Sequence, residues 1–376
     1  MDKITDLKEL LNNIGYIHLS DNGSFWRTNA VYRDGDNRTS LRINKNTGDF
    51  HDFVERKYGN INELIKLTLG IGDVELKTFY ATNQINLEQI VERDSKPKLI
   101  MEKFWSESEL ANLLPHYKFY EDRGITKETL KFFKSGFAHS GAMNERFVFP
   151  IYSITGQIHG WSGRDMTNKK EAKWKHLGKK MAWIYPAYMF NKVKKANGSG
   201  YELLYPVLEA IKKTREIILV ESIGDMLAHW ERGQFNVIVT FGLELSSKLG
   251  SFIMSQDIDR VVIALNNDKE SKKNNGKLAA ISMFIELMHY IDFEKIIIAL
   301  PSTKDFGEMT EEDFTKWNLR KNNYEKSRGV VYKEVLHELR ERYVAQKITP
   351  SQIKFGKALK ERYEETNPSQ TQSVPN

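Results

Sequence analysis

The chain has 376 residues, of which 40% are hydrophobic and 28% are charged, a composition typical of folded globular proteins rather than of disordered chains. It has no cysteine, which excludes disulfides, thiolate zinc sites and cysteine nucleophiles. Its 56 basic and 50 acidic residues give a net charge of +6, a weak indication of a polyanionic partner.

The N-terminal region, residues 1–75, is predicted to form a small β-rich module. Its first residues include acids where a signal peptide needs an unbroken apolar core, and no apolar run in the chain approaches the roughly 20 residues that span a bilayer. We therefore expect a cytoplasmic protein with no membrane partner.

Within the N-terminal module, two short strands are expected on either side of a turn at Lys45–Gly48, followed by a helix that begins at "GNINELI". Residues 76–103 are predicted to be a linker, because residues 85–103 are polar and interrupted by Pro97.

The next region, residues 104–212, is predicted to be a mixed α+β subdomain with a strongly basic surface. Residues 164–180 read "RDMTNKKEAKWKHLGKK" and contain seven Lys or Arg residues, with Trp174 among them. The run "NKVKK" at 191–195 extends this basic stretch. It indicates either a solvated loop face or a groove in which cations follow phosphates while aromatic rings stack on bases.

Residues 213–312 alternate short β-rich runs with helical patterns. Runs of Val and Ile without polar alternation predict a parallel sheet covered by helices on both faces. Ligands of such sheets bind beyond the carboxyl ends of the strands. The expected strands are "EIILV" (216–220), "NVIVT" (236–240), "VVIAL" (261–265) and "KIIIALP" (295–301), and the expected helices lie around 225–231, 246–255 and 277–289.

Acidic and amide side chains follow three of these strands. Glu221 follows the first strand with Asp225 four residues later, Asn266 and Asp268 follow the third, and Asp305 follows the fourth. Each acid is also compatible with a helix N-cap. Together they favour a metal site, and oxygen ligands without His or Cys favour magnesium or manganese over zinc. Neither GxxxxGK[ST] nor GxGxxG occurs, so ATP-driven translocation and dinucleotide binding are not supported.

The C-terminal region, residues 313–366, has apolar residues at helical spacing, notably Val331, Val335 and Leu339. This pattern predicts a short helical region that either packs against the rest of the protein or binds a partner. The last residues, 367–376, are expected to form a disordered tail.

Three segments of the predicted parallel sheet resemble the TOPRIM domain of DnaG-type bacterial and phage primases. They read "ILVESIGDMLAHWERGQFNVIVTFG", "VVIALNNDKESKKNNGKLAA" and "ALPSTKDFGEM". The resemblance implies that Glu221, Asp268 and Asp305 are catalytic and bind magnesium, and that Asp225 matches a second acid of the first motif. Asn266 stands where the family has the first carboxylate of a DxD motif. An amide oxygen still binds magnesium but adds no charge, so we expect weaker metal affinity.

Two upstream segments, "YEDRGITKETLKFFKSGFA" and "ERFVFPIYSITGQIHGWSGRD", are similar to the primase subdomain that precedes TOPRIM. In that family a basic ridge guides the template strand. By this resemblance Arg146 and Arg164, with Lys173 and Lys175 of the basic run, hold template or nucleotide phosphates. The resemblance extends over about residues 119–309.

The order of two short strands, a turn and a helix start in the N-terminal module is similar to that of the zinc ribbon of the same family, but every cysteine ligand is absent. His51 alone resembles a relic of a ligand, and no zinc is expected. Template recognition by this module would fall to Arg27, Arg33, Arg38, Arg42 and the neighbouring aromatic residues.

The function that this resemblance implies is that of a DNA primase, a DNA-directed RNA polymerase that makes short RNA primers on single-stranded DNA. It implies ribonucleoside triphosphates as substrates, magnesium or manganese as cofactor and a replicative helicase as partner of the C-terminal region. The missing zinc site and short C-terminal region indicate a phage-encoded form. Glu221 is alternatively a general base. Two other functions stay open: a TOPRIM nuclease or topoisomerase-like enzyme, and a catalytically inactive module that binds single-stranded DNA.

Overall fold

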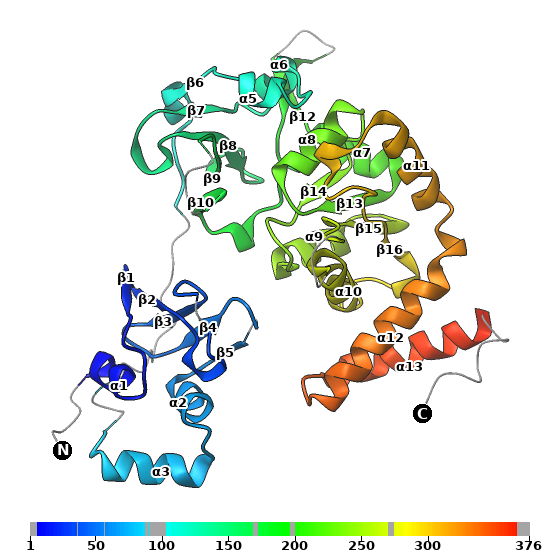
Figure 1. The fold of residues 1–376 in the computed structure, drawn as a ribbon. Helices are drawn as coiled ribbons and strands as arrows, with labels where there is room; N and C mark the ends of the chain where they lie inside the picture. Colours follow the sequence, from blue (N-terminus) through cyan, green and yellow to red (C-terminus); the bar gives the residue numbers. More distant parts are fainter. Residues whose placement is uncertain are drawn as a thin grey trace. The chain divides into compact units, whose positions relative to one another are not determined.

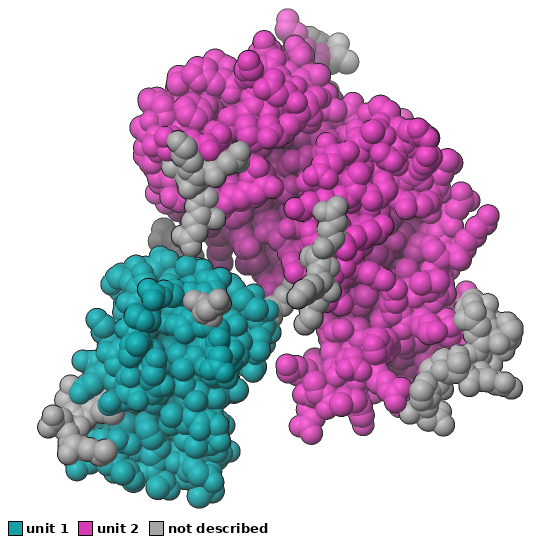
Figure 2. Space-filling model, viewed as in Figure 1, with its two compact units in different colours: residues 1–100 teal, residues 101–376 magenta. Residues whose placement is uncertain are grey.

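The computed structural model describes residues 6–35, 37–55, 57–86, 90, 103–167, 172–195, 200–269 and 274–366. The chain divides into two compact units, residues 1–100 and 101–376 (Figures 1 and 2). Each unit has its own apolar core. Within the described ranges, no helix combines the length and the apolar character needed to cross a membrane.

The first unit is built on a five-stranded antiparallel sheet in which each strand pairs with the next along the chain. The two strands predicted around the turn at 45–48 are confirmed as β3 and β4, and the predicted helix is α2, which Asn60 and Glu63 cap reciprocally. The elements are α1 (Leu7–Asn13), β1 (Ser20–Asn22), β2 (Phe25–Thr28), η1 (Val31–Arg33), β3 (Leu41–Asn44), β4 (Phe50–Asp52), β5 (Lys57–Gly59), α2 (Ile61–Leu69) and α3 (Asp73–Thr82).

The predicted boundary at residue 75 falls inside a helix. α3 begins at Asp73, where Glu75 accepts a hydrogen bond from the backbone N–H of Gly72, and it continues to Thr82. Leu76 and Ile85 are buried in the core of the first unit. The first part of the predicted linker therefore belongs to this unit, because its apolar residues are needed to complete a small core. Residues 87–89 and 91–102 of that linker lie outside the described residues.

A buried carboxylate holds three segments of the first unit together. Asp52 has no exposed surface and accepts hydrogen bonds from the Tyr32 hydroxyl at 2.6 Å and from Nε of Arg33 at 2.7 Å. The backbone N–H groups of Val54 and Glu55 also donate to its side chain. Asp52 thus links η1, the end of β4 and the turn that follows. A structural metal often makes links of this kind, and here a charge network makes them.

Replacing Asp52 with Ala is expected to destabilise the first unit by about 3–5 kcal/mol, because Arg33 would lose its buried partner. Burial alone would raise the pKa of Asp52, but hydrogen bonds from Arg33 and Tyr32 outweigh it and lower the pKa to about 2. A lowered pKa means that the stabilisation is complete above the ordinary value of 3.8 and is lost as the pH falls through about 2.

Hydrogen exchange of the first unit's amides in the full chain measures this effect. Asp21→Ala is the matched control, because Asp21 is an exposed partner of Lys45 and should contribute far less. Equal protection in both variants would contradict the role given to Asp52.

The second unit begins with an antiparallel five-stranded sheet in the order β10-β9-β8-β7-β6. Together with short helices, this sheet confirms the predicted α+β subdomain. Its elements are η2 (Glu107–Asn112), β6 (Leu113–Leu114), α5 (Lys118–Glu121), α6 (Lys127–Phe132), β7 (Gly136–Ala138), η3 (Gly141–Met143), β8 (Arg146–Tyr152), β9 (Ile158–Asp165), β10 (Trp174–Gly178) and η4 (Lys180–Ala182), followed by the hairpin β11 (Asn191–Lys194) and β12 (Tyr201–Leu204).

A four-stranded, fully parallel sheet follows, in the order β14-β13-β15-β16, which confirms the predicted architecture. α8 packs against β13 and β14, and α10 packs against β15 and β16 (Figure 1). The elements are α7 (Pro206–Thr214), β13 (Glu216–Val220), α8 (Ile223–Glu231), β14 (Val237–Val239), α9 (Ser247–Ser255), β15 (Arg260–Ala264), α10 (Asn275–Leu287), η5 (Phe293–Lys295), β16 (Ile296–Ile298) and η6 (Phe306–Glu308).

The predicted C-terminal helical region is confirmed as α11 (Glu311–Asn322), η7 (Tyr324–Lys326), α12 (Arg328–Val344) and α13 (Pro350–Thr366). α11 completes the core beside the parallel sheet, because its Phe314 and Trp317 pack against Phe306 and His229. α12 packs against both α10 and α13. The packing interpretation of this region therefore holds for α11 and α12. The predicted tail, 367–376, lies outside the described residues.

Candidate functional site

The four parallel strands end at one edge of their sheet, and this edge carries the predicted acidic residues. Glu221 follows β13 directly, Asn266 and Asp268 lie just after β15, and Asp305 lies in the segment after β16. The backbone N–H of Asn266 donates a hydrogen bond to the Glu221 carboxylate, and that carboxylate is close enough to Asp225 and Asp268 for their charges to alter its pKa. The fold thus brings together side chains that are up to 47 positions apart in sequence, from 221 to 268.

Glu221 is held in a form that resists ionisation. Burial raises its pKa first, and the neighbouring charges of Asp225 and Asp268 raise it further, to about 7. The Asn266 N–H and the Lys173 ammonium act in the opposite direction. A carboxylate in this position repels its neighbours when it ionises, so the edge favours a cation when Glu221 is charged.

Asp225 is 2% exposed, and both of its carboxylate oxygens accept hydrogen bonds. Ser222 donates from its hydroxyl at 2.7 Å and its backbone at 3.2 Å, and the Phe306 N–H donates at 3.1 Å. Burial is the main reason that its pKa rises to about 6, with the Asp305 charge adding to the rise and the Ser222 hydrogen bonds opposing it. Asp225 was predicted as a metal ligand. Its occupied oxygens favour a positioning role, in which it fixes the Asp305 segment against α8.

The segment "NND" presents two amides with different surroundings. Asn267 is buried and donates from its side chain to the Pro301 carbonyl at 2.7 Å, while its side-chain oxygen accepts from Asn274 at 2.8 Å. This amide ties the end of β15 to the segment after β16. The side-chain oxygen of Asn266 is buried without a hydrogen-bond partner in the described structure. A buried, unsatisfied oxygen beside Glu221 is a potential cation ligand.

The donor set fits magnesium by its chemistry, because Glu221, Asn266 and Asp268 offer carboxylate and amide oxygens only. In the described parts of the chain, however, no three Asp, Glu or His side chains lie close enough to one another to hold a metal ion. A site at this edge would therefore rest on two carboxylates together with the amide oxygen of Asn266.

Helix α10 approaches the strand-end segment so closely that only glycine fits at its second residue. A Cβ atom built at Gly276 would lie 1.8 Å from the backbone oxygen of Asn266. Gly276→Ala is expected to displace Asn266 and to destabilise the protein by about 1–3 kcal/mol. Urea unfolding measures this effect, with Lys277→Ala as the control at the next, exposed position of α10. A Gly276→Ala variant as stable as the unchanged protein would contradict the close approach.

A pocket of about 680 Å³ adjoins the acidic edge. The α+β subdomain contributes Arg164, Lys173 and Trp174 to its wall, and the parallel-sheet side contributes Asp225 and Asp305. The remaining lining residues are Tyr120, Arg123, Gly124, Ile125, Ser222, Gly224, Ala228, Glu231, Arg232, Gly307, Glu308 and Glu311. Two of the four basic residues predicted from the sequence therefore face two of the predicted acids.

Arg164 is a partly buried cation, whereas Lys173 is exposed but is partly shielded from water by the pocket wall. Burial is the main cause that lowers the pKa of Lys173, and Arg164 lowers it further, whereas Asp305 and Asp225 oppose the change. Nη1 of Arg164 is buried without a hydrogen-bond partner in the described structure, and the guanidinium carbon lies 5.9 Å from the ring centres of both Phe119 and Trp174. An unpaired guanidinium nitrogen in a pocket wall suits an anionic group of a ligand.

Arg146 and Lys175 do not line this pocket. Arg146 is 5% exposed, and its guanidinium donates to the carbonyls of Gly163 at 3.1 Å and Ala172 at 2.9 Å, so it joins β8 to β9 and to the segment just before β10. Lys175 follows Trp174 on β10, and alternate residues of a strand point to opposite faces. Its ammonium donates to the Ala142 carbonyl at 2.7 Å. In the described structure Arg146 and Lys175 thus contact backbone carbonyls outside this pocket, and their phosphate contacts stay a prediction.

Sequence reasoning did not identify Arg123 as a pocket residue. Its guanidinium carbon lies 3.7 Å from the ring centre of Phe119, which places it beside Arg164 around the same ring. The motif "YEDRGI" that carries the resemblance to primases contains Arg123 and was the available signal.

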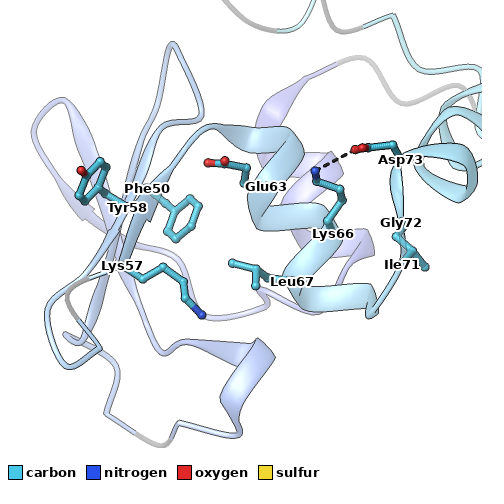
Figure 3. Close-up of a pocket in the computed structure, with 9 residues that line it drawn as sticks. All are labelled: Phe50, Lys57, Tyr58, Glu63, Lys66, Leu67, Ile71, Gly72 and Asp73. Carbon is cyan, nitrogen blue, oxygen red and sulfur yellow. Dashed lines mark hydrogen bonds and ion pairs between the residues drawn. The ribbon is translucent and has the colours of Figure 1, made fainter. Parts of the chain in front are cut away.

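A second hollow, of about 470 Å³, lies on the first unit between β5, α2 and the start of α3 (Figure 3). Phe50 and Leu67 form part of its wall, and the ammonium of Lys66 lies 2.9 Å from the Asp73 carboxylate. Because its charges compensate one another and no predicted site residue lies there, this hollow is a gap between packed elements.

The sequence and the fold are both similar to those of DNA primases. Residues 218–310 match the family model described as Toprim-like. The chain is 25% identical over 235 residues to a DNA primase of Borreliella burgdorferi, covering 60% of this chain and 40% of the relative. It is 24% identical over 296 residues to a DNA primase of Lactococcus lactis subsp. lactis, covering 65% of this chain and 44% of the relative. The chain thus spans less than half the length of both curated relatives.

Among solved structures, the zinc-binding and RNA polymerase domains of the Aquifex aeolicus primase share the fold, with a TM-score of 0.50 and 19% identity over 98% of this chain and 95% of that one. The resemblance to DnaG-type primases predicted from the sequence is confirmed. Residues 218–310 form a Toprim-like domain in a chain that is related to bacterial DNA primases.

Proposed function

We propose that this protein is a DNA primase that synthesises short RNA primers on single-stranded DNA from ribonucleoside triphosphates. The observation that carries the proposal is the pocket of about 680 Å³ in which Arg164 and Lys173 face Asp225 and Asp305 at the carboxyl edge of the Toprim-like sheet. Nucleotidyl transfer needs cationic side chains that bind phosphates next to acidic side chains that bind a metal ion. The kinship with proteins named DNA primase supports it.

In this proposal Glu221, Asp268 and Asn266 hold a magnesium or manganese ion, with Asp305 at the edge of the pocket. When bound, such an ion stabilises negative charge on a triphosphate and lowers the pKa of an attacking hydroxyl. Lys173 and Arg164 bind and orient the triphosphate. Each addition joins the 3′ oxygen of the primer to the α-phosphorus of the next nucleotide and releases pyrophosphate.

The first unit supplies a surface that suits a single-stranded template. The guanidinium carbon of Arg27 lies 4.5 Å from the ring centre of Phe53, and that of Arg42 lies 4.8 Å from that of Phe25. Aromatic rings and arginines on a sheet favour unpaired bases and phosphates. Of the four predicted arginines, Arg33 is engaged by Asp52, so we assign template contact to the other three, Arg27, Arg38 and Arg42.

The C-terminal helical region, 313–366, is the proposed contact for a replicative helicase, and a phage origin is proposed from the absent zinc ligands. Both proposals rest on the family resemblance rather than on a particular contact.

The test is incorporation of labelled ribonucleotides on single-stranded DNA of mixed sequence, with magnesium and then with manganese. Short products that ribonuclease removes are expected. Cutting of plasmid DNA without added nucleotides would favour a nuclease instead. Tight DNA binding with no incorporation under either metal would favour the catalytically inactive module.

A further inference from the structure

The second unit has another large groove, between helices α12 and α13. In the sequence, both helices come after all the acidic residues of the candidate site. The volume of the groove is about 640 Å³, and its lining residues come from α12, α13 and the turn that joins them. The apolar part of its lining, here called the floor, includes Leu336, Val344 and Ile353. Tyr343 and Val344 are 63% and 73% exposed, unusually high fractions for apolar residues beside a groove.

The charged residues that line this groove, here called its rim, are all basic. They are Lys333, Arg340, Lys357 and Lys360, and the lining contains no Asp or Glu. Lys360 lies 3.9 Å from Glu364 outside the lining. The other three cations are not part of an ion pair within the described residues, whereas Arg342 on α12 lies 2.9 Å from Glu338. The groove therefore combines an apolar floor with unneutralised cations at its edge.

We propose that this groove binds an acidic amphipathic helix of a partner protein. A partner helix with leucine-like side chains at positions i, i+4 and i+7 would fill the floor, and its flanking carboxylates would meet Lys333, Arg340 and Lys357. From residue 333 to residue 344 the groove follows α12 for about 16 Å, which corresponds to roughly three turns of a partner helix.

Other occupants fit less well. The residues after the last helix read "NPSQTQSVPN", with no acid and one Val, so they match neither the floor nor the rim. A second copy of the same groove would bring two cationic rims together, which is unfavourable. A nucleic-acid backbone would satisfy the rim but would leave the apolar floor unfilled.

The test uses the full chain and a fluorescent 15-residue peptide with Leu at helical spacing and Glu at the other positions, compared with the same peptide carrying Lys in place of Glu. The acidic peptide is expected to bind with a Kd of about 10–100 µM and the basic peptide at least tenfold more weakly. Arg340→Glu with Lys357→Glu should weaken binding of the acidic peptide at least tenfold. Lys354→Glu, an exposed change on α13 outside the groove, should leave it unchanged.

A second pair of variants tests the floor. Val344→Asp should remove binding, whereas Val330→Asp, at another exposed apolar position of α12 outside the groove, should not. Equal binding of the two peptides, or acidic-peptide binding that survives both groove changes, would overturn the proposal. So would self-association of the chain that Val344→Asp abolishes, or an oligonucleotide that displaces the peptide from the groove. Because Asp268→Ala should bind the peptide normally, failure of this proposal is distinguishable from failure of the primase proposal.

Discussion

Asp268→Ala is expected to reduce ribonucleotide incorporation by about a thousandfold or more while leaving the affinity for single-stranded DNA within roughly twofold. Asp268 lies beside Glu221 at the carboxyl edge of the sheet and is one of the two carboxylates in the proposed ligand set that includes Asn266. Because Asn266 contributes no charge, loss of Asp268 removes half of the negative charge that this set offers a cation. DNA binding should persist because the proposed template surface lies in the first unit.

The control for this variant is Asp292→Ala. Asp292 is an exposed acid that precedes β16, at the amino end of the strand. Its replacement therefore removes the same charge from the opposite edge of the sheet. Incorporation rates are measured with labelled ribonucleotides and DNA affinity by fluorescence anisotropy. Activity retained in Asp268→Ala, or lost equally in Asp292→Ala, would contradict the assignment of the acidic edge.

Glu221→Gln is expected to abolish activity and, at the same time, to stabilise the protein at pH 8 without divalent cations. The pKa of Glu221 rises on folding from 4.5 to about 7, chiefly through burial. An acid with a raised pKa costs no stability below pH 4.5, and the cost grows as the pH rises and is complete above about 7. Removing the ionisable group should therefore increase the free energy of unfolding by about 1–3 kcal/mol at pH 8.

Urea unfolding of both proteins between pH 4.5 and pH 8 measures this difference, which should shrink as the pH falls. Magnesium should stabilise the unchanged protein more than Glu221→Gln, because only the former offers the charged ligand. Glu209→Gln, an exposed change on α7, should show neither effect. A Glu221→Gln variant that is less stable than the unchanged protein at pH 8 would show that Glu221 makes favourable contacts and is not a strained acid.

The parallel sheet and its acidic edge were predictable because both follow from local sequence. Runs such as "EIILV" and "VVIAL" are buried on both faces, and the polar residues directly after them must then lie at the edge where parallel strands end. The partners of individual side chains were not predictable in the same way. Asp225 is held by Phe306, 81 positions later, and this contact determines that it positions a segment.

The basic run at residues 164–180 also shows that the partners of individual side chains cannot be predicted from sequence alone. Its charge indicated an anion-binding surface, but sequence spacing does not specify which cations face the pocket. Lys173 and Lys175 are two positions apart, yet only Lys173 lines the pocket, and Arg146 is committed to carbonyls of neighbouring strands. In the first unit, the absence of cysteine was evident from the sequence. The substitute link from Asp52 to Arg33, 19 positions earlier, depends on how the strands fold back.

Formation of the first phosphodiester bond is the step that the acidic edge and Lys173 are proposed to catalyse. Pyrophosphate release and the dinucleotide product are measured on a single-stranded DNA template with two ribonucleoside triphosphates and magnesium. The account predicts a template-dependent dinucleotide from the unchanged protein, strongly reduced product from Lys173→Ala and none from Asp268→Ala. Template binding without any dinucleotide from the unchanged protein under magnesium or manganese, or equal product from Asp268→Ala, would contradict it.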